Sequence, residues 1–124
     1  MGIGRGVAVA ALAWGVLLSG IAAAGAASAL AVGTCGAFGY GLDYARMADA
    51  DAAALAKCHG KCSVVARTRK GCAAFAVDIK NVCGPHGWAT GARLGKAQNS
   101  ALRECYRFGG RACVIRAFLC DAKG

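Results

Sequence analysis

The stretch AKCHGKCSVV, residues 56–65, joins the end of an expected helix to the start of an expected strand and carries two of the chain's eight cysteines. Cys58 and Cys62 flank His59. This spacing could serve a metal site, a redox pair, a cysteine nucleophile beside its base, or one part of a disulfide framework. The compartment in which the chain folds decides among them, and the N-terminal sequence bears on that compartment.

The N-terminal segment has the composition of a secretory signal peptide. Its one charge is Arg5, an apolar run covers Val7 to Leu18, and small residues follow from Ala22 to Ala31. An uncleaved membrane anchor is the less favoured alternative, because the Ala/Gly-rich second part is weakly hydrophobic. We therefore expect a secreted or periplasmic protein.

The expected cleavage site is Ala29-Leu30-Ala31, which fits the A-x-A rule. Cleavage there predicts a signal peptide over 1–31 and a single cysteine-rich domain over 32–124. Ala27-Ser28-Ala29 is an alternative site. A lipoprotein anchored through Cys35 is less favoured, because Thr precedes this cysteine where Gly or Ala is usual.

All eight cysteines lie within the expected domain. Such a cysteine content in a short exported chain is typical of a disulfide scaffold. A domain of this size buries little surface, so covalent cross-links are needed for stability. We expect disulfides to engage Cys35, Cys58, Cys62, Cys72, Cys83, Cys105, Cys113 and Cys120.

The chain is basic, with 15 Lys and Arg against 6 Asp and Glu and a formal net charge of +9. This charge favours acidic partners, such as an anionic envelope component or an acidic protein. The basic residues are dispersed apart from Arg67, Arg69 and Lys70, which form a candidate binding surface. No ladder of aromatic residues accompanies them, so the sequence carries no specific signal for nucleic acid.

Two pairs of similar segments indicate an internal repeat. CGAFGYG (35–41) and CGPHGWA (83–89) both read Cys-Gly-x-x-Gly-aromatic, and ADAAALAKC (50–58) resembles AQNSALREC (97–105). The residues shared by the second pair recur at helical spacing. The sequence therefore predicts a duplicated domain.

The two pseudo-repeats are expected over about 35–80 and 83–122. Each should contain an extended segment, a helix and a β-hairpin, with β-branched residues in the hairpin strands. The expected elements cover 36–41, 47–58, 62–67, 72–79, 86–90, 94–106 and 112–118. The predicted fold is α+β, in which two β-α-β-β units form one antiparallel sheet with both helices on one face.

The repeat favours a disulfide framework over active chemistry at CHGKC (58–62). Its counterpart CYRFGGRAC (105–113) has a longer loop and a tyrosine in place of His59, a difference that a framework tolerates. A metal site specific to the first half is the less favoured alternative. A cysteine enzyme needs a free thiolate beside a base, and every cysteine of this chain is expected to be in a disulfide instead. No pair of carboxylates has a spacing that indicates catalysis. We assign no catalytic or metal residues and no cofactor, and we expect a protein that is not an enzyme.

Tyr40 and Trp88 occupy the aromatic position of the two Cys-Gly-x-x-Gly-aromatic segments. They could lie on a common surface as anchors for a partner. They could instead pack between helix and sheet with their polar tips exposed, which is the favoured interpretation. Both are kept as candidate binding residues.

The order of these motifs resembles the bacterial exported family known as domain of unknown function 4189. The residues that carry the resemblance are Ala54-Leu55-Ala56-Lys57-Cys58, Cys62-Ser63-Val64-Val65, Cys72-Ala73-Ala74-Phe75-Ala76, Ala101-Leu102-Arg103-Glu104-Cys105, Gly109-Gly110, Cys113-Val114-Ile115 and Cys120. The resemblance implies export and a compact duplicated fold, and it carries no catalytic residues.

The sequence is most consistent with a non-catalytic binding module stabilised by disulfides. An inhibitor or immunity-type protein against another exported protein, and a secreted effector, are the alternatives. Locality and symmetry suggest one pairing scheme among the many that eight cysteines allow. It joins Cys58 to Cys72, Cys105 to Cys120, Cys35 to Cys83 and Cys62 to Cys113.

Overall fold

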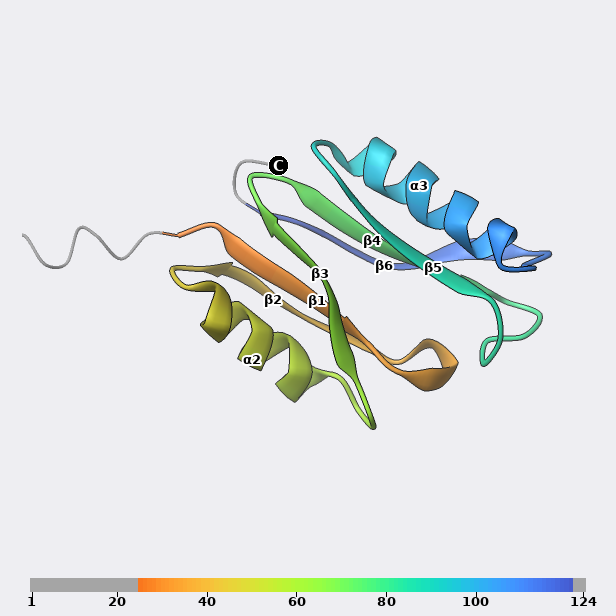
Figure 1. The fold of residues 1–124 in the computed structure, drawn as a ribbon, viewed down its shortest axis with the longest axis horizontal. Coiled ribbons are helices and arrows are strands. Elements are labelled where there is room, and N and C mark those ends of the chain that lie inside the picture. The colour runs from red at the N-terminus through yellow and green to blue at the C-terminus, as the bar shows by residue number, and fades with distance from the viewer. Residues whose placement is uncertain (1–24, 122–124) are drawn as a thin grey trace, which may run out of the picture.

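The computed structural model describes residues 25–121, which form two three-stranded antiparallel sheets and two helices (Figure 1). The first half contains β1 (Ala27–Val32), a 3-10 turn (Thr34–Gly36), β2 (Phe38–Tyr44), α2 (Met47–Lys57) and β3 (Ser63–Arg69). The second half contains β4 (Cys72–Asp78), β5 (His86–Gly91), α3 (Leu94–Arg107) and β6 (Cys113–Cys120). The predicted class, α+β and rich in disulfides, is confirmed.

The helices and sheets stack in four layers, with an apolar cluster at each of the three contacts between layers. One cluster lies between the two sheets and contains Leu30 of β1 and Phe75 of β4. A second cluster packs α3 on the outer face of its sheet, and a third packs α2 on the outer face of the other sheet. Figure 1 shows the two helices on opposite outer sides of the paired sheets. The fold is therefore a helix-sheet-sheet-helix sandwich.

The prediction of one sheet with both helices on one face is wrong. The strand orders are β2-β1-β3 and β5-β4-β6, so each half builds its own sheet. The physical reason is that β1 and β4 are buried along their whole length. A central strand with two apolar faces needs a cover on each side, and here a helix covers one face and the other sheet covers the second.

The central strands ASALAV (27–32) and CAAFAV (72–77) take matching places in the two sheets. In each, the large residue faces the opposite sheet and the flanking alanines face the helix. The element order is thus β-β-α-β in both halves, where β-α-β-β was expected. The strand at 72–78 is the first strand of the second half. Its counterpart in the first half is β1, which lies before residue 35, where the first pseudo-repeat was expected to begin.

That counterpart, β1, falls within the segment expected to be removed as a signal peptide. A domain that began at Val32 would lack all but the last residue of this central strand. Residues 1–24, which hold most of the expected signal peptide, lie outside the described residues, and the cleavage itself stays a prediction. Across residues 25–121, no helix is long and apolar enough to cross a membrane.

Four disulfides engage all eight cysteines, as Cys35–Cys83, Cys58–Cys62, Cys72–Cys120 and Cys105–Cys113. The predicted bridge between the halves, Cys35–Cys83, is confirmed, and the other three predicted pairs are wrong. In each half the chain turns back after the helix, so the cysteine at the helix end meets the next cysteine along the chain. Cys72 and Cys120 are register partners on β4 and β6.

The first glycine after each Cys-Gly-x-x lets a helix approach the edge strand closely. A Cβ atom on Gly87 would lie 2.6 Å from the carbonyl oxygen of Ala101 and 2.6 Å from the amide nitrogen of Cys105. Gly39 has the corresponding contacts with α2. The following residue, Tyr40 or Trp88, then points to the opposite side of its strand.

We expect Gly87→Ala to destabilise the protein by about 1–3 kcal/mol, because the backbone of α3 must move away from β5. Gly95→Ala in the same helix is the matched control, since a Cβ there meets nothing within 4 Å. It should stabilise by about 0.5–1 kcal/mol through helix propensity. Thermal unfolding followed by circular dichroism measures both; a Gly87→Ala protein as stable as wild type would contradict the close packing.

Candidate functional site

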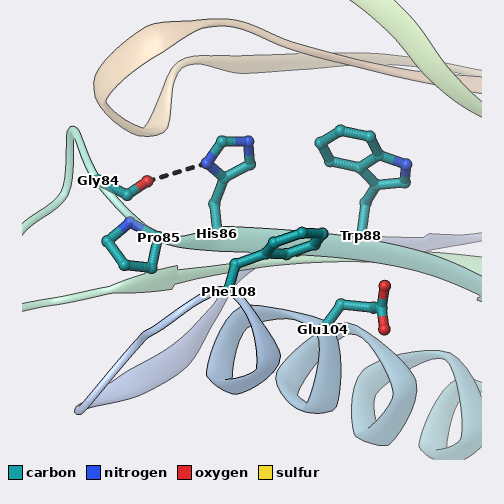
Figure 2. Close-up of a pocket in the computed structure, with 7 residues that line it drawn as sticks. Gly84, Pro85, His86, Trp88, Glu104 and Phe108 are labelled. Atoms are coloured by element: carbon teal, nitrogen blue, oxygen red, sulfur yellow. Dashed lines mark hydrogen bonds between the residues drawn. The ribbon is translucent and has the colours of Figure 1, made fainter.

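A hollow of about 520 Å³ lies between β5 and the C-terminal end of α3 (Figure 2). We call it the Trp88 hollow. Its lining residues are Gly84, Pro85, His86, Gly87, Trp88, Glu104 and Phe108. Two aromatic side chains, an imidazole and a carboxylate therefore surround one cavity, and the segments that carry them meet only in the folded chain.

His86 and Trp88 project from the same side of β5, because they alternate along the strand. Their rings stack with centroids 5.6 Å apart, and the His86 ring also meets the edge of Phe75 at 6.1 Å. The His86 Nδ1 atom lies 3.0 Å from the Gly84 carbonyl oxygen (Figure 2). A carbonyl oxygen can only accept, so Nδ1 donates this hydrogen bond and carries a proton.

Glu104 on α3 and Phe108, which caps the C-terminal end of this helix, lie four residues apart and reach the hollow from the other side of β5 (Figure 2). Arg107 contacts both: its Nη1 lies 3.4 Å from a Glu104 carboxylate oxygen, and its Cζ lies 5.7 Å from the Phe108 ring centroid. The Arg107 side chain is 69% exposed. Exposed pairs of this kind contribute little to stability, so the Glu104 carboxylate is held only loosely.

Asp78 at the end of β4 fixes the loop that supplies Gly84 and Pro85. Its carboxylate accepts hydrogen bonds from the backbone amides of Arg111 at 3.0 Å and Lys80 at 2.8 Å. These bonds stabilise the charged form, with that from Arg111 the largest cause, and they lower the pKa of Asp78 below its ordinary value. The Asp78 amide in turn donates to the Pro85 carbonyl.

Asp78→Asn should lower the melting temperature by several degrees at neutral pH, because an amide cannot accept both backbone bonds as a carboxylate does. A lowered pKa in the folded state stabilises the protein above the ordinary Asp pKa of about 3.9, and this contribution disappears as the pH falls through the lowered value. The deficit of the variant should therefore shrink at about pH 2.5.

Melting temperatures at the two pH values measure this effect. Asp49→Asn is the control, because the Asp49 side chain is about half exposed on α2, and its replacement should change the melting temperature little at either pH. A deficit for Asp78→Asn that is the same at both pH values would contradict the assigned role of the carboxylate.

A second cavity of about 350 Å³ lies on the other side of His86 and Trp88, where β5 meets β3. We call it the seam hollow. Val65 of β3 and Lys61 also line it. The two stacked rings thus form a wall that is open to both hollows, and Trp88 is 39% exposed.

The structure does not bring the two predicted aromatic residues together. Tyr40 lines a separate hollow of about 450 Å³, with Phe38 of β2 and Arg116 of β6. β2 lies against β6 at one edge of the sandwich and β5 lies against β3 at the other. Tyr40 and Trp88 each face the opposite sheet rather than a helix, and both are more than a third exposed.

The three predicted basic residues, in contrast, do line one cavity. Arg67, Arg69 and Lys70 surround a hollow of about 340 Å³ at the turn between β3 and β4. Arg67 is held by Asp51, with Nε 2.9 Å from one carboxylate oxygen and Nη2 3.0 Å from the other. The hydrogen bond and the charge of Asp51 raise the pKa of Arg67 above its ordinary value. Arg69 and Lys70 supply the remaining positive charge.

At CHGKC, the Cys58–Cys62 disulfide closes the turn after α2, and His59 lies exposed in that turn. Sulfurs joined in a disulfide cannot act as thiolate nucleophiles or ligands. In the part of the chain that the structure describes, no three His, Cys, Asp or Glu side chains are grouped so as to hold a metal ion.

Sequence reasoning found Trp88 but missed His86, Glu104 and Phe108 as its neighbours. A local signal existed for each pair. His86 and Trp88 alternate along a strand, and Glu104 and Phe108 have helical spacing. The sequence does not reveal that the C-terminal end of α3 lies next to β5. This placement depends on the close contact of the helix with Gly87.

Comparison with known proteins gives one match. The model of a family described as Domain of unknown function (DUF4189) matches residues 27–120. The match begins at the first residue of β1 and ends at the last residue of β6, so it includes both sheets. No curated protein and no solved structure matches the chain.

Proposed function

The chain belongs to the DUF4189 family, a domain of unknown function, and on that premise we propose that it is an exported, non-catalytic binding module whose ligand enters the Trp88 hollow. The observation that carries the proposal is the hollow itself. Its volume of about 520 Å³ falls in the range of small-molecule sites, and aromatic rings with a few polar groups are their usual lining. None of its lining residues carries a hydroxyl or thiol nucleophile.

Export is supported by the four disulfides, which form and persist in an oxidising compartment. The signal-peptide composition of the N-terminal segment points the same way. We place the cleavage upstream of Ala27, so that β1 stays in the mature chain. Ala22-Ala23-Ala24 and Ala24-Gly25-Ala26 both fit the A-x-A rule there.

A duplication is the simplest origin for the two halves. Each has the order β-β-α-β, its first strand in the middle of its sheet, and a disulfide from the helix end to the last strand or its approach. The Cys35–Cys83 bridge joins equivalent residues of the two halves.

Saturation-transfer NMR on the mature protein tests the proposal. The probes are N-acetylglucosamine, benzoate and benzylamine, which are neutral, anionic and cationic. At least one should receive saturation from the wild-type protein and lose it with Trp88→Ala, because the ring forms a wall of the hollow. Tyr40→Ala, the matched change at the opposite edge, should preserve the signal. No signal from any probe, or equal signals with both variants, would contradict a binding role for this hollow.

The cavity at the β3–β4 turn supports a second candidate, the binding of an anionic envelope component or acidic protein. Arg69 and Lys70 face this one hollow, and Thr90 could donate a hydrogen bond to an anion. Binding of this kind should weaken with rising salt. Replacing both basic residues by Ala should abolish binding of a polyanion such as polyglutamate; binding unchanged by the replacement would rule this candidate out.

A further inference from the structure

Each half presents a pair of rings at equivalent positions of its edge strand. Phe38 and Tyr40 on β2 correspond to His86 and Trp88 on β5 through the shared Cys-Gly-x-x-Gly-aromatic motif. The register agrees, since Tyr40 lies opposite Leu30 of β1 and Trp88 lies opposite Phe75 of β4. The two edges can therefore be compared position by position.

At the first edge, cations of the chain itself cover both rings. The Arg116 guanidinium carbon lies 5.4 Å from the Phe38 ring centroid, and its Nε donates to the Gly36 carbonyl oxygen at 3.0 Å. The Lys57 ammonium lies 6.0 Å from the Tyr40 ring centroid. Cations over aromatic faces are attracted by the electrons of the ring. Each ring of the first edge therefore has a cation of the chain itself near its face.

At the second edge, neither cation is present. Glu104 takes the helix position of Lys57, immediately before the last cysteine of the helix. Val65 takes the strand position of Arg116. In the described residues, no Lys or Arg lies over His86 or Trp88. The second edge therefore has the two rings without a cation over them, and it has a carboxylate where the first edge has Lys57.

The correspondence of Val65 with Arg116 rests on the strand register. The pairing of β1 with β3 shifts at the step Leu30–Ala31, and Val65 is the extra residue there. The pairing of β4 with β6 shifts at the equivalent step Phe75–Ala76, and Arg116 is the extra residue. Both side chains thus leave their sheet at the same kind of bulge, toward the neighbouring edge strand.

We propose that the Trp88 hollow binds a guanidinium group that enters from outside the chain, which deepens the proposed function by naming its ligand chemistry. The Trp88 face would stack on the planar cation, and the Glu104 carboxylate would neutralise it and accept its hydrogen bonds. The exposed Arg107 already shows this chemistry at one rim, between Glu104 and Phe108. The incoming group displaces it from the carboxylate.

The positive net charge of the chain opposes binding of a cation, so we expect weak binding to a single guanidinium, with a dissociation constant on the order of 1 mM. Lys61 lines the seam hollow on the far side of the rings and adds to this repulsion. Specificity for the guanidinium group is therefore measured by comparing matched probes and matched variants, because the affinity for a single probe is low.

Fluorescence titration of the mature protein tests the inference, because Trp88 is the one tryptophan from Ala27 onward. The probes are N-acetyl-arginine methylamide and its citrulline analogue, which has nearly the same shape without the charge. The arginine probe should bind at least about tenfold more tightly. Equal binding of the two probes would overturn the inference.

Two variants convert the second edge into the pattern of the first. Glu104→Lys should abolish binding of the arginine probe. Val65→Arg should weaken binding about tenfold, because it adds a second cation beside Lys61 in the seam hollow behind the rings. Lys57→Ala, at the opposite edge, is the control and should leave binding unchanged. Binding that survives Glu104→Lys would contradict the assigned site.

A third probe, the peptide Gly-Arg-Gly, distinguishes the sources of the group. If it binds no more tightly than the acetylated amino acid, the side chain alone is recognised and a free guanidinium compound suffices. At least tenfold tighter binding indicates a partner protein, as an inhibitor or immunity-type role would require. If no guanidinium probe binds while N-acetylglucosamine or benzoate still occupies the hollow, this inference fails and the proposed function stands.

Discussion

A chain that begins at Val32 will not fold, whereas a chain that begins at Ala27 will fold with all four disulfides. The shorter chain loses nearly all of β1, the strand that pairs with β2 on one side and with β3 on the other. It also loses Leu30, which is fully buried between the sheets. Truncating one such side chain costs about 2–5 kcal/mol, and whole domains are stable by only about 5–15 kcal/mol.

Oxidative refolding of the two chains, followed by far-ultraviolet circular dichroism and intact mass, measures this difference. The chain from Ala27 should show a cooperative thermal transition and a mass lower by eight hydrogens, and the chain from Val32 should show neither. The exported protein should likewise begin at or before Ala27. If the chain from Val32 folds, β1 is dispensable, and the predicted cleavage after Ala31 is again compatible with the fold.

Removing the Cys72–Cys120 bridge should destabilise the protein about twice as much as removing Cys58–Cys62. The first bridge closes a loop with a sequence separation of 48 and the second a loop with a separation of 4. The loss of chain entropy in the unfolded state then predicts costs of about 4 and about 2 kcal/mol. The corresponding falls in melting temperature are about 15–30 °C and about 8–15 °C.

Paired alanine replacements, Cys72→Ala with Cys120→Ala and Cys58→Ala with Cys62→Ala, allow this comparison without leaving an unpaired thiol. The strand pairing itself should survive the first replacement, because Ala27 and Arg69 hold the equivalent register position in the first sheet without a disulfide. Melting temperatures under non-reducing conditions measure the effect. A larger fall in melting temperature on removing Cys58–Cys62 would contradict this account. It would show that the bridge stabilises the folded state rather than restricting the unfolded chain.

Local patterns predicted the parts of the fold that depend on local interactions. The helices were expected at 47–58 and 94–106 and are found at Met47–Lys57 and Leu94–Arg107. Helical spacing of alanine and leucine is a signal within a single segment. The α+β class was predictable from the order of such local segments, and the cysteine-rich framework was predictable from composition.

The remaining features depend on contacts between distant segments. β1 was missed because ASALAV, made mostly of small residues, has the composition of a signal-peptide end as well as of a buried strand. The number of sheets depends on which strands are covered on both faces. The Cys72–Cys120 bridge depends on the register of β4 with β6, which no spacing along the chain reveals.

The candidate site was predictable only in part. The repeat singled out Trp88, because an aromatic residue occupies the same place in both halves. From the sequence alone Glu104 is one more exposed acid; the structure shows that it lines the same hollow as Trp88, on a helix whose close approach to β5 requires Gly87. The proposed role of Glu104 comes from comparing it with Lys57, the residue at the same position in the first half. This comparison needs the fold as well as the sequence.

The most direct test of this account is a two-dimensional ¹H–¹⁵N NMR titration of the mature protein with N-acetyl-arginine methylamide. It reports both edges of the sandwich in one experiment. We predict that the Trp88 indole and the backbone amides of His86 and Glu104 shift in a saturable way, while those of Phe38 and Tyr40 do not. Shifts confined to Tyr40 and its neighbours, or no saturable shift at either edge, would contradict the assignment of an open cation site to the second half.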